Sequence, residues 1–415
     1  MLFCNFFQTG ILFSAFNATS ITLVPKDLNP NSMRDFRPIS CCSMIYKCIT
    51  KIIANRLKLY MPKLVSNNQS AFITGRSISD NVLLAQELVR GYARSTLSPR
   101  CAIKVDLQKA FDTLDWRFIL EILSVLRFPE QFLGWIKGCI TFSKFSISLN
   151  GGLVGYFRGA RGVRQGDPLS LYLFVLAMNV LSRLLDAAAR YGVFSYHPMC
   201  KRINLTHLCF ADDLLIFSKG NLESVIGVKK ILCLFYAYSG LQLNCGKSEL
   251  FHTGISRTMM EEIQYTTGFK LGKLPVRYLG IPLITRRLNA RDCSMLVERI
   301  IARINSWTSK LLSYAGRLQL IQTVLFSMHN YWCRIFLLPK RVIKRINQIC
   351  ARFFWKGSDQ TSKGARVSWA TICHPKAEGG LGIKDTLSWN KACIIQNIWS
   401  IMAKAGSLWI AWIEA

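Results

Sequence analysis

Two adjacent aspartates, Asp212 and Asp213, occupy the middle of the otherwise apolar stretch Leu208–Phe217, which contains no basic residue to neutralise them. Placing unpaired carboxylates side by side in partly buried surroundings is costly unless a proton or a cation compensates their charge. Magnesium binds preferentially to one or two carboxylates together with phosphate oxygens and water. The pair therefore predicts a site for a divalent cation.

A third carboxylate, Asp106, ends the short apolar segment Cys101–Asp106. We expect strands to bring Asp106 beside the aspartate pair on one sheet. That arrangement is typical of a two-metal site, which holds the attacking 3′ oxygen and the leaving pyrophosphate of a phosphoryl transfer. Taken alone, an Asp-Asp turn is also common as a polar hairpin tip. Asp112 and Asp115 are interpreted as charges at helix N-termini.

Apolar periodicity predicts the elements that must position these residues. Two hairpins are expected, one around Asn150–Gly151 within residues 145–157 and one around the aspartate pair. The remaining predictions are strands over residues 101–106, 205–210, 214–218 and 247–251, helices over 44–64, 80–94, 116–126, 169–190 and 221–238, and two or three basic amphipathic helices within 291–354. Strand signals fade beyond Tyr278.

The charge of the chain points to a polyanionic partner. The 415 residues include 53 Lys or Arg against 23 Asp or Glu, a formal net charge of +30. Between Lys270 and Lys376 there are 20 basic and three acidic residues. Aromatic residues lie among these bases, a combination that suits phosphate neutralisation with base stacking. A generally basic protein whose aromatic residues form its core remains the alternative.

Length and composition limit the number of subdomains, the chemical state of the cysteines and the expected cellular location. A chain of this length is expected to form two to four subdomains. Its 15 cysteines lack the spacing of a zinc module or a disulfide framework, so we expect reduced thiols. The uncharged residues 1–25 include polar side chains and no basic start, unlike a signal or membrane segment. We expect an intracellular protein, nuclear or cytoplasmic, with no membrane partner.

Several segments together resemble the reverse transcriptase of LINE-type, non-long-terminal-repeat retrotransposons, most closely the plant elements. The segments occur in the family's order and are Arg37–Ser40 (RPIS), Lys104–Asp112 (KVDLQKAFD), Arg161–Ser170 (RGVRQGDPLS), Phe210–Asp213 (FADD) and Ser239–Ser248 (SGLQLNCGKS). Gln69–Arg76 and Tyr278–Pro282 extend the resemblance, which covers about Thr22 to Lys384.

The resemblance implies an α+β, right-hand polymerase. It places a fingers segment in residues 1–100, a palm with part of the fingers in 101–285, a helical basic thumb in 286–356 and a connector in 357–415. The implied activity is that of an RNA-directed DNA polymerase. Such an enzyme adds deoxynucleotides (dNTPs) to the 3′-OH of a DNA primer on an RNA template, with Mg²⁺ or with Mn²⁺ in its place.

The resemblance also implies roles for individual residues. Asp106, Asp212 and Asp213 match the catalytic carboxylates that bind the metal ions. Phe111 matches the aromatic residue that lies under the incoming sugar and excludes a 2′ hydroxyl; core packing is its alternative role. Lys247 matches a lysine proposed to protonate the leaving pyrophosphate, and it could equally be a base that tracks phosphates.

The nucleotide pocket is expected to involve four more residues. Gln165 and Gly166 match the motif that shapes this pocket, where a side-chain amide and a close backbone approach are needed. Arg37 and Lys26 match fingertip positions that contact the triphosphate, and Arg37 suits phosphate better because its guanidinium is planar. Either cation could instead be solvated on the surface. Asp167 is expected to help start the following helix.

The sequence departs from the family in two respects. Leu171 stands where family members commonly have proline, a change that should perturb the start of a helix without removing a chemical group. Complete element proteins have an endonuclease upstream and a cysteine-rich segment downstream, so we expect a chain truncated at both ends. The competing hypothesis is an inactive element remnant that only binds nucleic acid. RNA polymerase activity is disfavoured by the bulky Phe111.

Overall fold

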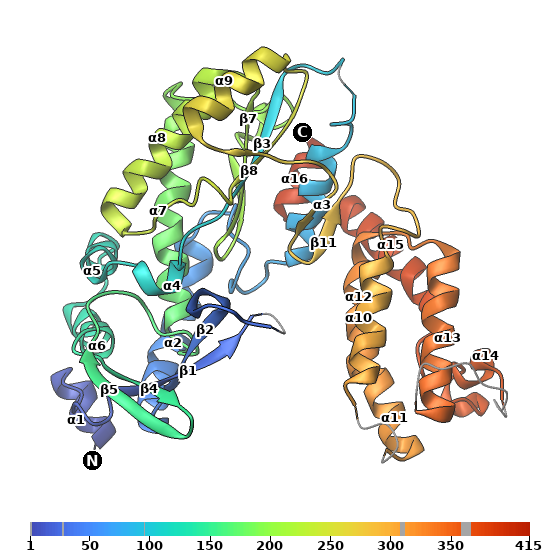
Figure 1. Cartoon of the computed structure of the whole chain (residues 1–415), viewed down its shortest axis with the longest axis horizontal. Coiled ribbons are helices and arrows are strands. Elements are labelled where there is room, and N and C mark those ends of the chain that lie inside the picture. The colour runs from blue at the N-terminus through green and yellow to red at the C-terminus, as the bar shows by residue number, and fades with distance from the viewer. Residues whose placement is uncertain (1, 27–28, 95, 308–311, 358–366) are drawn as a thin grey trace. The chain divides into compact units, whose positions relative to one another are not determined.

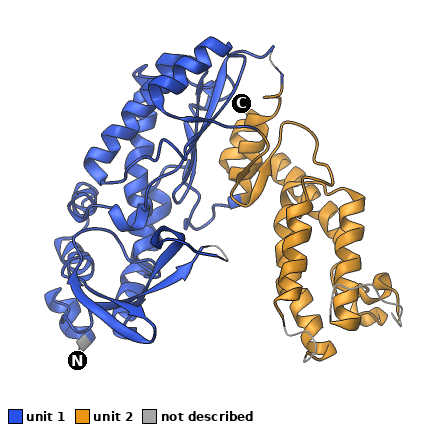
Figure 2. Cartoon of the chain, viewed as in Figure 1, with its two compact units in different colours: residues 1–78, 94–273 blue, residues 79–93, 274–415 orange. Residues whose placement is uncertain are grey.

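A computed structural model describes residues 2–26, 29–94, 96–307, 312–357 and 367–415. The chain forms two compact units, one of residues 1–78 and 94–273 and the other of residues 79–93 and 274–415 (Figure 2). The predicted division into fingers, palm, thumb and connector stays a prediction. Residues 308–311 of the predicted thumb and 358–366 of the predicted connector lie outside the described residues.

Unit 1 contains a five-stranded sheet in the order β6-β7-β3-β8-β9 (Figure 1). β3 lies at its centre and pairs antiparallel with both neighbours, and β8 pairs parallel with β9. The apolar runs predicted as strands form four of these elements. The bounds are β3 Arg100–Val105, β6 His207–Phe210, β7 Asp213–Lys219, β8 Glu249–Thr253 and β9 Lys270–Leu271.

A second sheet of unit 1 has the strand order β2-β1-β4-β5. The predicted hairpin at Asn150–Gly151 joins β4 to β5, and both turn residues have positive φ, as a tight hairpin turn requires. β1 pairs parallel with β4 across a long sequence separation, which local patterns cannot predict. The bounds are β1 Ala18–Pro25, β2 Phe36–Cys42, β4 Lys144–Leu149 and β5 Gly152–Arg158.

The helices of unit 1 bury their apolar faces in one core that also includes the five-stranded sheet. The helices predicted over 44–64, 116–126, 169–190 and 221–238 are confirmed as α2, α5, α7 and α8. The bounds are α1 Leu2–Thr9, η1 Met33–Asp35, α2 Met44–Leu64, α4 Ala110–Thr113, α5 Trp116–Val125, α6 Glu130–Ile140, α7 Ser170–Arg190, η2 Lys201–Ile203, α8 Leu222–Ser239 and α9 Arg257–Thr267.

α7 is the longest apolar helix of unit 1. By length and composition alone it could cross a membrane, but most of its residues are buried, and it packs against α2, α5 and α8. Asp167 accepts hydrogen bonds from the Leu169 N–H at 3.3 Å and the Ser170 hydroxyl at 3.1 Å, as expected of a residue that starts this helix. Leu171 lies in the first turn, so the helix begins at Ser170 without the family's proline.

Unit 2 is mainly helical. Among the described residues the basic region 291–354 forms three helices, as predicted. They are α10, a second helix in which α11 continues through a π-helical turn at Ile321–Leu325 into α12, and α13. β11, which follows Tyr278, is too short to give a periodic signal. The bounds are α3 Ile78–Val89, β10 Val276–Tyr278, β11 Ile281–Leu283, α10 Ser294–Asn305, α11 Tyr314–Leu320, α12 Phe326–Ile335, α13 Lys340–Lys356, α14 Trp369–Ile372, η5 Lys376–Glu378, α15 Thr386–Met402 and α16 Leu408–Glu414.

Candidate active site

The register of the five-stranded sheet brings the three predicted carboxylates to one edge. Val105, the last residue of β3, lies opposite Leu214 of β7, so the next position along the register places Asp106 beside Asp213. The β6–β7 hairpin closes with the pair Phe210 and Asp213, which leaves Ala211 and Asp212 as its two-residue turn. A strand end and a hairpin turn thus meet at the same place, as the sequence predicted.

The Asp-Asp turn is held by a buried side chain, Gln69. Ala211 adopts the left-handed conformation, with φ of 55°. The Gln69 Oε1 accepts hydrogen bonds from the Ala211 N–H at 3.0 Å and from the Ala71 N–H at 2.9 Å. Its Nε2 donates to the Ala211 carbonyl at 3.4 Å and to the Cys209 Sγ at 3.1 Å. One amide therefore fixes both backbone groups of the residue before Asp212.

The segment that carries Gln69 is itself fixed on the free edge of β6. The Cys209 N–H donates to the Asn68 carbonyl at 2.8 Å, and the Ser70 N–H donates to the Cys209 carbonyl at 3.0 Å. The Arg76 guanidinium donates to several carbonyls of the preceding turn, including that of Gln69 at 2.6 Å. Composition and periodicity predict no role for this segment, and only its resemblance to the family indicates that it matters.

The electrostatics of the three carboxylates favour a cation. Desolvation raises the pKa of Asp212, the charge of Asp106 raises it further, and the charge of Arg37 opposes the rise. Desolvation also raises the pKa of Asp213, as do the charges of Asp212 and Asp106, while Lys104 opposes the rise. The side chains themselves reach solvent. Negative charge is therefore concentrated at an accessible edge of the sheet.

Metal binding was tested against the donor set and its geometry. Three carboxylates supply the oxygen ligands that Mg²⁺ prefers. Among the residues that the structure describes, however, no group of three or more His, Cys, Asp or Glu is arranged so that it could hold a metal ion. The fold brings the backbones of the three aspartates together, and their carboxylates are suitable ligands for the ion. Closing the set around an ion requires the side chains to turn toward one another.

Lys247 lies on the other side of Asp106. The Ser248 Oγ accepts a hydrogen bond from the Asp106 N–H at 3.0 Å, and the Asp106 carbonyl accepts one from the Asn244 N–H at 2.9 Å. These bonds fix the turn before β8 against the end of β3, with Lys247 exposed beside it. The predicted proton donor therefore lies in the turn before β8, the strand that borders β3 on the side opposite to β7.

Phe111, Gln165 and Gly166 are brought together by the loop before α7. Phe111 lies on α4, half-buried, and its ring stacks on Phe174 of α7 with centroids 4.7 Å apart. Its carbonyl accepts from the Val163 N–H at 2.7 Å, two residues before Gln165. Gly166 has φ of 112°, a conformation that side chains rarely adopt. Both predicted roles of Phe111 are compatible with this position, because one face packs on α7.

Gln165 links this loop to its surroundings. Its Nε2 makes a long contact of 3.5 Å with the Asp112 carboxylate, and its carbonyl accepts from the Ser40 N–H at 2.9 Å. The latter bond joins the loop to β2, the strand that carries Arg37.

The two predicted triphosphate ligands lie on neighbouring strands. Arg37 of β2 pairs in register with Val24 of β1, two residues before Lys26. Both cations are exposed, and the Lys26 Nζ donates to the Arg34 carbonyl at 2.5 Å. The charge of Arg37 acts on Asp212, so these two residues are within electrostatic reach of each other.

Comparison with known proteins gives the family. The model of the family "Reverse transcriptase (RNA-dependent DNA polymerase)" matches residues 24–283. The chain is 27% identical to a Transposon TX1 149 kDa protein from Xenopus laevis over 91% of this chain and 28% of that protein. It is 29% identical to a Pol polyprotein of the type-2 retrotransposable element R2DM from Drosophila melanogaster, over 88% of this chain and 34% of that protein.

The chain thus spans about a third or less of the length of these relatives. Among solved structures, a telomerase from Candida tropicalis in complex with a telomeric RNA fragment is similar, with 13% identity and a TM-score of 0.47 over 93% of this chain and 62% of that one. The mixed α and β composition, with sheets that are mainly antiparallel, agrees with the predicted fold class. Because the family model covers more than half of the sequence, the chain belongs to the reverse transcriptase (RNA-dependent DNA polymerase) family.

Proposed function

We propose that this chain is the RNA-directed DNA polymerase domain of a non-long-terminal-repeat retrotransposon protein, which extends the 3′-OH of a DNA primer on an RNA template. The observation that carries the proposal is the meeting of Asp106, Asp212 and Asp213 at one sheet edge. Family membership and the similarity to two transposon proteins support it.

The three aspartates would hold Mg²⁺. Bound there, the metal would neutralise charge that develops on the attacking 3′ oxygen and on the leaving pyrophosphate. The chain's own contribution is placement: the register of β3 and β7 sets Asp106 beside Asp213, and Gln69 fixes the turn at Asp212. Positioning of this kind supplies most of the catalysis in phosphoryl transfer.

Five residues would receive the incoming nucleotide: Phe111, Gln165, Gly166, Arg37 and Lys26. Phe111, braced against Phe174, would present its ring under the sugar, where a 2′ hydroxyl would collide with it. Gly166 allows the backbone to approach the nucleotide closely. Arg37 and Lys26 would contact the triphosphate, and Arg37 is near enough to the aspartates to act on their charge.

Lys247 would donate a proton to the departing pyrophosphate. The hydroxyl of its neighbour Ser248 accepts a hydrogen bond from the Asp106 N–H, which holds the turn that carries Lys247 next to the end of β3. An exposed ammonium group next to a developing pyrophosphate suits general acid catalysis.

We further propose that the basic helices of unit 2 form a thumb that binds the template–primer duplex. On α13, Lys340, Arg341, Lys344 and Arg345 are exposed while the apolar side chains between them are buried. Origin from a plant element is proposed from the motif resemblance, and the similar proteins come from both animals and plants. An intracellular location follows from the proposed nucleic-acid substrates.

A primer-extension assay tests the proposal. Purified chain, a DNA primer on an RNA template, dNTPs and Mg²⁺ should yield extended primer, and Asp212→Ala should abolish extension. Asp115→Ala is the matched control, because Asp115 caps α5 and lies outside the proposed site. A chain that binds the duplex without extending it would support the inactive remnant. Extension that survives Asp212→Ala would contradict the proposed site.

A further inference from the structure

A fully buried histidine begins β6, the strand that leads into the Asp-Asp turn. This residue, His207, has no exposed surface. Burial lowers the pKa of His207 to about 3, so its ring is neutral at pH 7. A neutral imidazole offers one hydrogen-bond donor and one acceptor, and buried polar groups normally have partners. The partners of this ring therefore indicate which segments it fixes.

Both ring nitrogens have polar neighbours. The Nε2 lies 2.8 Å from the Ser182 hydroxyl of α7. The Nδ1 lies 3.3 Å from the side-chain amide nitrogen of Asn68 and 2.7 Å from the Thr206 hydroxyl, which donates to the Asp186 carboxylate at 2.6 Å. An amide has both a donor and an acceptor, so Asn68 can bond to Nδ1 whichever ring nitrogen carries the proton. The ring therefore joins β6 and α7 to the segment 68–70.

Three polar side chains of α7 point to the same contact region. Asn179, Ser182 and Asp186 are spaced three and four residues apart, so they lie on one face of this largely apolar helix. The Asn179 Oδ1 accepts from the Ser66 N–H at 2.9 Å, and its Nδ2 donates to the Leu64 carbonyl at 3.0 Å. This face of α7 therefore fixes both β6 and the chain that leads to the segment 68–70.

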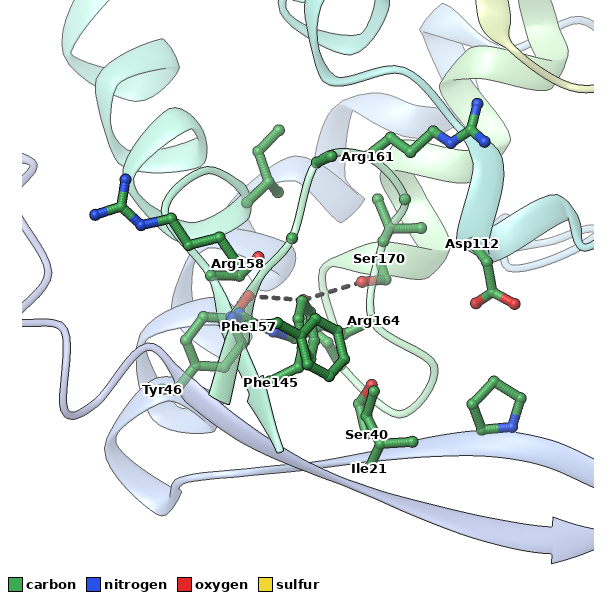
Figure 3. Close-up of a pocket in the computed structure, with 18 residues that line it drawn as sticks. Ile21, Ser40, Tyr46, Asp112, Phe145, Phe157, Arg158, Arg161, Arg164 and Ser170 are labelled. Atoms are coloured by element: carbon green, nitrogen blue, oxygen red, sulfur yellow. Dashed lines mark hydrogen bonds between the residues drawn. The ribbon is translucent and has the colours of Figure 1, made fainter. Parts of the chain in front are cut away.

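The same helix begins beside the proposed nucleotide pocket. Its first residue, Ser170, lines a cavity of about 300 Å³ together with Ser40 and Asp112 (Figure 3). One turn later, Phe174 stacks on Phe111. One helix therefore supports the nucleotide pocket at its start and the surroundings of the aspartate turn farther along.

Asn68 and Gln69 are consecutive, and both contact the edge of β6. His207 and Cys209 are two residues apart on this strand, so their side chains lie on one face, which Asn68 and Gln69 contact. The Asn68 carbonyl also accepts from the Cys209 N–H at 2.8 Å. Gln69 in turn holds Ala211 in its left-handed conformation. A displaced Asn68 would therefore move Gln69 away from the turn.

We propose that His207 is a positioning residue for the aspartate site: by fixing Asn68, it keeps Gln69 under the turn that presents Asp212. The inference rests on the proposed polymerase function. Because His207 is fully buried, it acts through these neighbours and not on the substrate. A histidine that only filled the core would instead lower activity in proportion to the stability lost, whichever ring nitrogen a substitution replaced.

Two substitutions separate the two sides of the ring. An asparagine side chain ends near the position of Nδ1, so His207→Asn should keep the contact with Asn68 and lose the one with Ser182. A glutamine side chain reaches the position of Nε2, so His207→Gln should keep Ser182 and lose Asn68. In primer extension, we expect kcat to fall about tenfold or more for His207→Gln, with an unchanged KM for dNTPs, and less than about threefold for His207→Asn.

Amide hydrogen exchange tests the same point without catalysis. In the metal-free protein without nucleic acid, peptides that span the turn should exchange about tenfold faster in His207→Gln and at the wild-type rate in His207→Asn. Asn68→Ala removes the partner amide and should reproduce the His207→Gln result, which keeps the test decisive if that variant does not fold. His197→Gln is the matched control, because His197 is also buried but packs on Phe217 of β7.

Three outcomes would overturn the inference: equal defects in His207→Asn and His207→Gln, turn exchange that neither His207→Gln nor Asn68→Ala accelerates, or equal acceleration by His197→Gln. Each would leave His207 as a core residue. Thermal unfolding measures the stability of every variant. If the wild type fails to extend primers while His207→Gln alone among the histidine variants accelerates exchange at the turn, the polymerase function is rejected and the positioning of the turn stands.

Discussion

At the scale of single residues, the fold holds the carboxylates of Asp106, Asp212 and Asp213 close enough to repel one another. Asp212 and Asp213 have raised pKa values because of desolvation and because each lies near other carboxylates. A carboxyl whose pKa is higher in the folded state binds protons more tightly there than in the unfolded chain. Stability therefore falls as pH rises from the ordinary carboxyl range through the raised pKa. The fold thus retains an arrangement that costs stability and that a cation would relieve.

Asp212→Asn should therefore stabilise the metal-free protein at pH 7, since it removes a repelling charge, while it lowers the extension rate about a thousandfold or more. The stability gain should vanish at pH 3, where the carboxyl is protonated in both states. Thermal unfolding across this pH range measures it. Excess Mg²⁺ should raise the midpoint of the wild type and not that of the variant. A variant that is less stable than the wild type at pH 7 would contradict the electrostatic account.

Phe111→Val should increase ribonucleotide incorporation relative to deoxynucleotides by about tenfold or more, because a smaller side chain leaves room for the 2′ hydroxyl. Losing the stack on Phe174 should also cost about 2 kcal/mol of stability. Phe174→Leu is the control, since it weakens the same stack while it keeps the ring at position 111. If both variants change sugar selection equally, Phe111 acts only through packing.

At the scale of elements, the turn at the aspartates depends on a segment far away in the sequence. Residues 68–70 pair with the edge of β6, and Gln69 reaches under the turn. Gln69→Leu should leave the Ala211 and Ala71 N–H groups without partners, at a cost of about 1 to 3 kcal/mol each. We expect kcat to fall at least tenfold with little change in the KM for dNTPs.

Steady-state kinetics and chemical unfolding measure the two effects of Gln69→Leu. Gln242→Leu makes the same substitution at an exposed position and should be nearly neutral. An enzyme with a normal kcat but lower stability would show that Gln69 supports the fold without positioning the aspartates.

Elements with a local pattern were predictable from the sequence, whereas contacts between distant segments were not. The helix over residues 44–64 was predictable because its apolar residues recur with a helical period, and the strand leading to Asp106 was predictable because it is a short apolar run. The pairing of β1 with β4, and of residues 68–70 with β6, was not, because such contacts join segments without any local pattern. The three carboxylates could be placed together from their types and motifs. Gln69 could not, since a lone glutamine carries no sign of burial.

At the scale of the whole molecule, the net charge of +30 should dominate nucleic-acid binding. Affinity for template–primer should fall steeply with salt. Lys344→Ala with Arg345→Ala on α13 should reduce the slope of log affinity against log salt by about 2, and do so equally for all sequences. Gln348→Ala on an exposed position of the same helix is the uncharged control. An unchanged slope would show that α13 does not contact the duplex phosphates.

If Asp106 and the Asp212–Asp213 turn together form one divalent-metal site, a metal ion bound there lies next to both segments. Replacing Mg²⁺ with Fe²⁺ and adding peroxide and ascorbate cleaves a polypeptide next to the bound metal, and mass spectrometry locates the cuts. We expect cuts near both residue 106 and residue 212, and we expect excess Mg²⁺ and Asp212→Asn to suppress them. Cleavage at only one of these segments, or cleavage that Asp212→Asn leaves unchanged, would contradict it.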